Sequence, residues 1–122
     1  MKDMTLKEFF DEEESLLEYE GPILYTLRYQ GQLYLVVAVD YFLETQQAKF
    51  MAAPVSDQQV ADLKAGKITS RSVYDDAGQV WIITQGWATP ENTITVVEAN
   101  IADIPEDDKP TIDSYIANRE EA

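Results

Sequence analysis

The sequence contains no cysteine and no histidine, and these absences exclude several kinds of chemistry. Neither Cys–His nucleophilic catalysis nor a Ser–His–Asp triad can be built from the remaining side chains. Zinc and copper sites that depend on imidazole or thiolate ligands are excluded as well. The lack of cysteine also favours the cytoplasm over an oxidising compartment.

Long apolar runs are missing too. No stretch reaches the length of a membrane-spanning helix, and the N-terminal Met1-Lys2-Asp3-Met4 is not followed by the apolar segment of a signal peptide. We therefore expect a cytoplasmic protein that has no membrane partner.

Basic residues are scarce: the sequence has 9 Lys and Arg but 23 Asp and Glu, so its formal net charge is −14. Such a surface repels phosphate backbones, so we expect no direct nucleic-acid partner and instead a basic protein partner. The charge is concentrated at the two ends of the chain. Residues 1–20 and residues 98–122 each carry a net charge of −6, whereas residues 21–97 carry −2.

Two capping boxes predict two short helices. Thr5 is followed three residues later by Glu8, and Ser56 by Gln59, so each pair places a hydroxyl at the N-cap and a reciprocal acceptor at the third helical position. The first helix is expected to end or fray in the acidic run that follows it, where negative charge is unfavourable. The second is expected to end at Gly66, a residue suited to the C-terminal cap.

Five further segments alternate apolar and polar residues, or are apolar throughout, as strands do. They span residues 22–29, 32–40, 49–55, 79–84 and 93–99. Gln30-Gly31 and the segment from Asp75 to Gly78 are predicted turns. The order of elements predicts an α+β fold with a mostly antiparallel sheet of about five strands, two short helices and an acidic C-terminal tail.

The length of 122 residues suits one domain. We assign residues 1–104 to a single acidic α+β domain and residues 105–122 to the acidic tail. Pro105 and Pro110 predict an extended start for this tail, and Thr111 is placed to cap a short docked helix within it.

The run Asp11, Glu12, Glu13 and Glu14 is the most prominent cluster of charge, and we take it as a candidate contact surface for a basic partner. Its alternative role is a solvated helix end that keeps the protein soluble. Trp87 follows Gly86 in a predicted polar loop. It either folds back on the core or serves as an interface anchor, a role that Trp often fills.

The carboxylates do not form a recognisable catalytic or metal-binding motif. An EF-hand loop that begins at Asp75 would need Glu at its twelfth position, which is Gly86. Asp40, Glu44 and the pair Asp75-Asp76 lie at strand ends or in loops, where glycosidase carboxylates would lie, but 23 acids produce such pairs by chance. We therefore expect no catalytic residues, no metal site and no cofactor.

A central part of the chain, from Tyr19 to Tyr74, resembles an uncharacterised family of small bacterial domains. The segments that carry the resemblance are Tyr19-Glu20-Gly21-Pro22-Ile23-Leu24, Tyr34-Leu35, Val39-Asp40, Ala53-Pro54-Val55-Ser56 and Leu63-Lys64-Ala65-Gly66. The resemblance implies a bacterial or phage origin and a shared fold. It implies no activity, and the acidic ends lie outside it.

Small size, negative charge and the missing catalytic side chains favour a non-enzymatic binding protein of the inhibitor or immunity type, which neutralises a basic protein. One alternative is a DNA mimic in an anti-defence role, although the nearly neutral middle of the chain argues against it. A second is an accessory subunit that acts only in assembly, and a third is a small carboxylate-dependent enzyme. The oligomeric state, the partner and the pathway stay open at this point.

Overall fold

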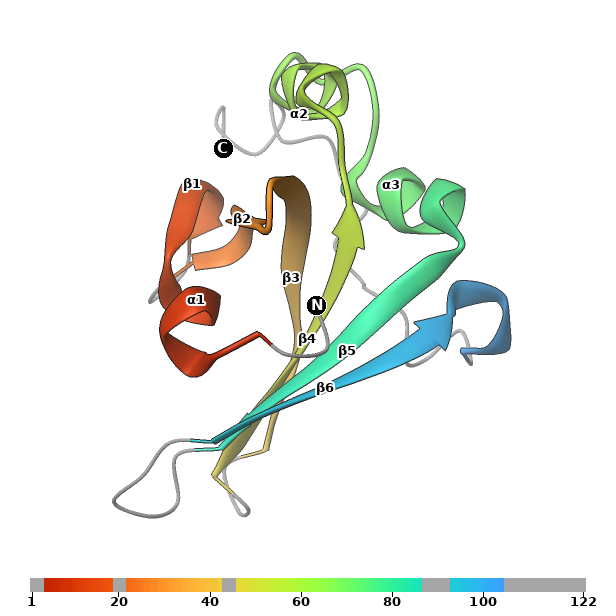
Figure 1. Cartoon of the computed structure of the whole chain (residues 1–122). Helices are drawn as coiled ribbons and strands as arrows, with labels where there is room; N and C mark the ends of the chain where they lie inside the picture. The colour runs from red at the N-terminus through yellow and green to blue at the C-terminus, as the bar shows by residue number, and fades with distance from the viewer. Residues whose placement is uncertain (1–3, 19–21, 43–45, 87–92, 105–122) are drawn as a thin grey trace.

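The computed structural model describes residues 4–18, 22–42, 46–86 and 93–104 (Figure 1). Its strands are β1 (Glu12–Glu18), β2 (Pro22–Tyr29), β3 (Gln32–Phe42), β4 (Gln47–Pro54), β5 (Gln79–Gly86) and β6 (Thr93–Asn100). Its helices are α1 (Leu6–Phe10), α2 (Asp57–Lys64), α3 (Ser70–Ala77) and the 3-10 helix η1 (Ile101–Asp103).

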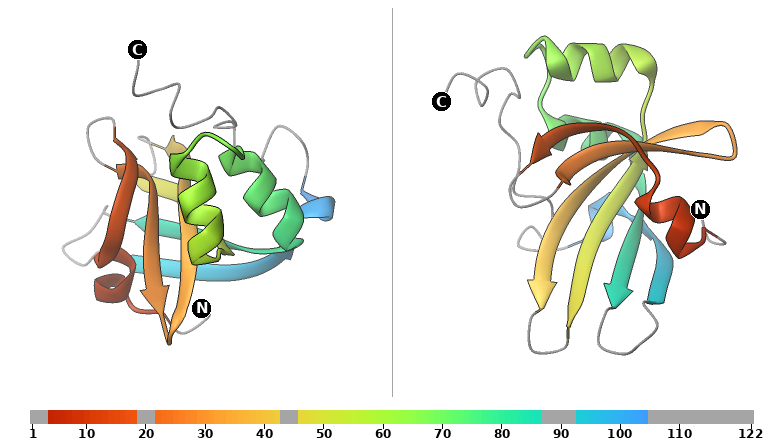
Figure 2. Two further views of the ribbon diagram at one scale, coloured as in Figure 1. Left: turned by 90° about the horizontal axis from the view of Figure 1, so that it is seen from above. Right: turned by 90° about the vertical axis from the view of Figure 1, so that its left-hand side faces the viewer.

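All six strands belong to one antiparallel sheet, in which each strand pairs with its neighbours in sequence, in the order β1-β2-β3-β4-β5-β6. The α+β fold is thus confirmed, with six strands where the sequence predicted about five. The sheet is strongly twisted and curved, so that β1 and β2 cross the direction of β5 and β6 at a steep angle (Figure 2).

Both faces of the sheet are buried. One face packs against α2 and α3 through a cluster that includes Leu35, Met51, Leu63 and Tyr74. The other face packs against α1 through an aromatic cluster, in which Phe9 meets the ring of Phe50 edge to face at 4.9 Å. The predicted strand from residue 32 to 40 is therefore covered on both sides, because its alternate residues contribute to the two clusters.

The local signals in the sequence account for several element ends. Both predicted capping boxes are present, at Thr5 with Glu8 and at Ser56 with Gln59. The predicted turn Gln30-Gly31 joins β2 to β3 with φ of 50° and 81°, which is the pattern of a type I′ hairpin. The register of the sheet follows from this two-residue loop, since Tyr29 pairs with Gln32.

Two segments differ from the prediction. Helix α3 occupies Ser70–Ala77, so Asp75 and Asp76 lie in its last turn and not in a turn between strands. Thr69 caps this helix by accepting a hydrogen bond from the Ser72 N–H, and Gly78, at φ 73°, terminates it. Helix α1 ends at the acidic run, as predicted, with Asp11 as its C-cap, but the residues that follow form a strand, β1, which the sequence did not predict.

Candidate partner-binding surface

The acidic run begins at the end of α1 but continues into the sheet. Asp11 is the C-cap of α1 and donates its backbone N–H to the Glu8 carbonyl oxygen at 3.2 Å. Glu12 pairs with Leu27 of β2 and Glu14 with Thr26, and the register shifts between these two pairs. Asp11 lies at the helix end, as predicted, whereas Glu12–Glu14 belong to a strand, because pairing with β2 competes successfully with extension of a helix of five residues. The choice between partner contact and a solubilising role for this run stays a prediction.

Glu13 forms a two-pronged ion pair with Arg28 of β2. Its carboxylate oxygens lie 3.1 Å from Nε and 3.3 Å from Nη2 of the guanidinium. The Nη2 atom also lies 3.9 Å from Asp57 at the start of α2. The hydrogen bond to Glu13 raises the pKa of Arg28, and the charge of Glu13 adds to this effect. Arg28 thus links its own strand, β2, to the edge strand β1 and to the start of α2.

Glu14 forms a second ion pair, with the ammonium group of Lys64 at the end of α2. Both partners are nearly half exposed. Together with the pair at Glu13, this contact means that two of the four candidate acids already bind bases of their own chain. Asp11 is exposed and, within the described residues, makes no ion pair.

The other candidate, Trp87, lies outside the described residues, as do residues 105–122. The structure therefore places Asp11 at the end of α1 and Glu12–Glu14 on the edge strand β1, with Glu13 beside Arg28 and Glu14 beside Lys64.

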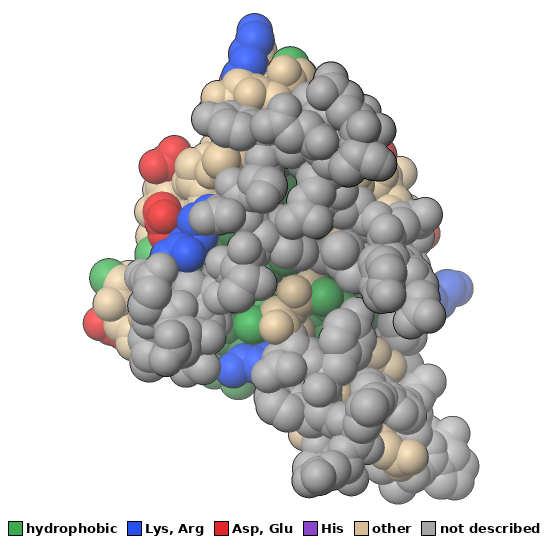
Figure 3. All heavy atoms as spheres, turned by 180° about the vertical axis from the view of Figure 1, so that it is seen from behind, with side chains coloured by type: hydrophobic (Ala, Val, Ile, Leu, Met, Phe, Trp, Pro, Cys, Tyr) green, Lys and Arg blue, Asp and Glu red, His purple; other side chains and the backbone are tan. Residues whose placement is uncertain are grey.

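A second acidic surface, which the sequence prediction missed, lies where α3, β6 and η1 meet. The exposed acids there are Asp75, Asp76, Glu98 and Asp103. Arg71 lies 3.4 Å from Asp75 one turn along α3. Asp and Glu side chains are visible along this side of the molecule when it is seen from behind (left in Figure 3). The sequence does not reveal this surface because its acids are far apart in the chain and belong to three elements, of which η1 packs against α3.

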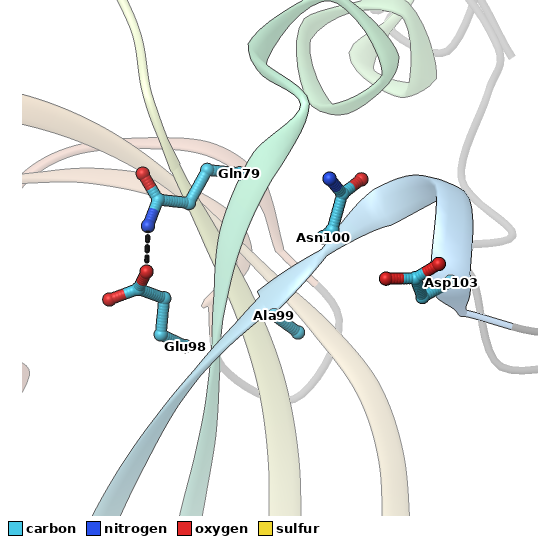
Figure 4. A pocket seen from close by; sticks show the side chains of 5 residues that line it. All are labelled: Gln79, Glu98, Ala99, Asn100 and Asp103. Atoms are coloured by element: carbon cyan, nitrogen blue, oxygen red, sulfur yellow. Dashed lines mark hydrogen bonds between the residues drawn. The ribbon is translucent and has the colours of Figure 1, made fainter.

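An open pocket of about 590 Å³ lies on this second surface. Its lining side chains come from the start of β5, the end of β6 and η1, and they are Gln79, Glu98, Ala99, Asn100 and Asp103 (Figure 4). Glu98 accepts a hydrogen bond from the Gln79 side-chain amide, and Asn100 caps η1 by accepting from the Ala102 N–H at 2.9 Å. The carboxylate of Asp103 faces the same hollow, so the pocket is polar and acidic.

Within the described ranges, no three Asp or Glu side chains come together in the manner of metal ligands. The helices that the structure describes are also all too short or too polar to span a bilayer. The carboxylates of both acidic surfaces are spread along exposed elements, an arrangement that suits contact with an extended cationic surface.

No protein-family model, curated protein sequence or solved structure matches this chain. The resemblance of Tyr19 to Tyr74 to a bacterial domain family therefore stays a prediction from the sequence.

Proposed function

We propose that this protein is a non-enzymatic, acidic binding module of the inhibitor or immunity type, which neutralises a basic protein partner. The observation that carries the proposal is the distribution of its charges. Arg28, Lys64 and Arg71, three of the nine basic residues, each contact a carboxylate of the same chain. The large excess of acids, at a net charge of −14, then determines the field around the molecule.

A field of one sign accelerates encounter with a partner of the opposite sign and discourages partners of the same sign. For an inhibitor, rapid association matters because the target must be captured before it acts. The cytoplasmic location predicted from the sequence belongs to this proposal, since an immunity-type protein acts where its target would cause damage.

The test begins with capture of partners from the organism that encodes the chain, followed by binding measurements with the purified partner at low and high salt. We expect a basic protein that binds with fast association, loses affinity as salt rises, and loses its own activity in the complex. A partner of neutral or acidic charge, or one whose activity is unchanged in the complex, would contradict the proposal.

Two variants of equal charge locate the contact. The first replaces Asp11, Glu12, Glu13 and Glu14 by Asn or Gln. The second does the same at Asp75, Asp76, Glu98 and Asp103. Each removes the same number of negative charges, so a slower association in one variant alone identifies the surface that faces the partner. Equal slowing in both would indicate long-range attraction without a preferred surface.

A further inference from the structure

The two edges of the sheet differ in how regularly they pair. The ladder between β1 and β2 is interrupted by register shifts between Glu12 and Glu14, and again on either side of Leu17. Such bulges, with charged residues, keep an edge from accepting another strand. The ladder between β5 and β6 runs through eight consecutive pairs without a shift. The regular edge is therefore the one at β6.

The hydrogen-bond pattern shows which backbone groups of β6 are directed outward. The N–H of Ile101 donates to the Gly78 carbonyl oxygen at 2.7 Å, one step beyond the pair Gln79 and Asn100. Bonded and non-bonded pairs alternate along an antiparallel ladder, so every second residue of β6 turns its N–H and C=O away from β5. These residues are Ile94, Val96, Glu98 and Asn100. None of the strands in the described ranges pairs with this side of β6.

The side chains of this edge also favour strand addition. Residues 93–97 are Thr, Ile, Thr, Val and Val, all β-branched and uncharged. Val97 is a large apolar side chain and is 55% exposed. Ile94 and Val96 lie on the opposite face of the strand, half-buried beside the aromatic cluster. Proteins that act alone usually protect a long, regular, apolar edge of this kind with charged residues, a proline, a bulge or a covering segment.

The negative charge beside this edge favours an added strand that carries positive charge. The end of β6 carries Glu98, and the pocket beside it adds Asp103 (Figure 4). A residue directly across from Glu98 on an added strand would lie within reach of its carboxylate, and opposite charges at such positions stabilise pairing. A second copy of this chain would instead bring together two molecules that each carry −14.

We propose that β6 is the docking edge for an extended segment of the basic partner, which adds to the sheet as a further strand. The segment presents apolar side chains opposite Val96 and Val97, and Lys or Arg opposite Glu98. Main-chain hydrogen bonds to the outward groups of β6 would provide affinity, and these side chains would provide selectivity. The inference rests on the proposed function, since it specifies how the basic partner is held.

A direct test uses the intact chain and a capped synthetic peptide, Lys-Thr-Lys-Val-Val-Thr-Val, whose antiparallel addition matches this pattern. We expect backbone amide shifts in the NMR spectrum, and slower amide exchange at Ile94, Val96 and Glu98, with no change along β1. A peptide with Glu in place of both Lys residues should leave the spectrum unchanged. Equal effects of both peptides, no effect of either, or amides on this edge that are already protected in the free chain would overturn the proposal.

The second test compares Val96→Pro with Val96→Ala in binding to the purified partner. Both lose side-chain packing, but only proline removes the outward N–H, and edge strands tolerate proline at such positions. We expect the proline variant to bind about tenfold more weakly than the alanine variant. Should the proline variant unfold, Val97→Lys compared with Val97→Thr repeats the test at an exposed position, and lysine should repel the basic segment.

The outcomes separate the two proposals. If the basic partner binds all of these variants equally well, the edge at β6 is not its docking site while the proposed function stands. If the intact chain binds no basic protein, the proposed function fails, and the peptide experiment still decides whether β6 accepts a strand. A dimer in sedimentation experiments that Val96→Pro dissociates would show that a second copy occupies the edge, which also overturns the inference.

Discussion

The hydroxyl of Tyr74 in α3 donates a hydrogen bond to the carbonyl oxygen of Leu35, at 3.1 Å, in the middle of β3. The carbonyl oxygen of Met51 in β4 lies 3.4 Å from the same hydroxyl. The side chain is fully buried, so the hydroxyl has no water to replace these contacts. This one residue therefore fixes the position of α3 over the two central strands of the sheet.

Replacing Tyr74 by Phe should lower the free energy of unfolding by about 1–2 kcal/mol, because the ring keeps its packing while the buried hydrogen bond of the hydroxyl is lost. Urea denaturation followed by circular dichroism measures the change. The matched control is Tyr34→Phe, which alters a tyrosine of the other cluster. A loss at Tyr74 no larger than the loss at Tyr34 would show that the hydroxyl does not hold the helix.

The same burial makes stability sensitive to high pH. It raises the pKa of Tyr74 well above its ordinary value, and the charge of Tyr25 adds to this effect. Below about pH 10 the hydroxyl is protonated in both folded and unfolded chains, so it contributes no pH dependence. Above that pH the unfolded chain loses the proton and the folded chain keeps it, so the free energy of unfolding should fall as pH rises.

Urea midpoints at pH 8, 10 and 11 would detect this fall, and Tyr74→Phe should reduce its slope. Some slope should survive in the variant, because burial also raises the pKa of Tyr34. An identical slope in the variant and the intact chain would place the effect on other groups.

The hairpin between β2 and β3 offers a stabilising substitution. Gln30 is exposed and adopts φ of 50°, a conformation that Asn tolerates better. We expect Gln30→Asn to raise the free energy of unfolding by about 0.5 kcal/mol. Gly31→Ala is the control with the opposite expected effect. The added Cβ would meet no other atom, but φ of 81° strains any L side chain, so the free energy of unfolding should fall by about 1 kcal/mol. Thermal melts of both variants measure the two changes.

The ion pair between Glu13 and Arg28 should contribute little to stability despite its two short contacts, because both side chains are nearly half exposed. A double-mutant cycle with Glu13→Gln and Arg28→Gln should show that the effects of the two substitutions on stability are close to additive. A strong coupling would mean that the pair is needed to hold β1 against β2, and the same result would remove Glu13 from the candidates for partner contact.

The parts of the fold that the sequence predicted are those with a complete local signal. Each capping box lies within four residues, and the turn at Gln30-Gly31 needs only those two residues. Helix α3 was missed because Asp75 and Asp76 resemble turn residues. Its signals are the N-cap at Thr69 and the terminating glycine at Gly78, which lie nine residues apart.

Strand β1 was missed for a different reason. Consecutive glutamates are poor strand formers, and two of them, Glu13 and Glu14, pair with Arg28 and Lys64, which come from β2 and α2. The second acidic surface likewise depends on packing, since its acids belong to α3, β6 and η1, and η1 packs against α3. No local pattern could have revealed these relationships.

The sequential order of the strands has a mechanical consequence. Among the strands that the structure describes, β1 and β6 come first and last in sequence, and they are also the two edges of the sheet. A pulling force on the chain ends would therefore open an antiparallel ladder one residue pair at a time, starting from the outside. A sheet whose terminal strands lie side by side in its interior must break many bonds at once. The protein should thus peel apart at low tension, and be threaded readily by a machine that pulls on one end.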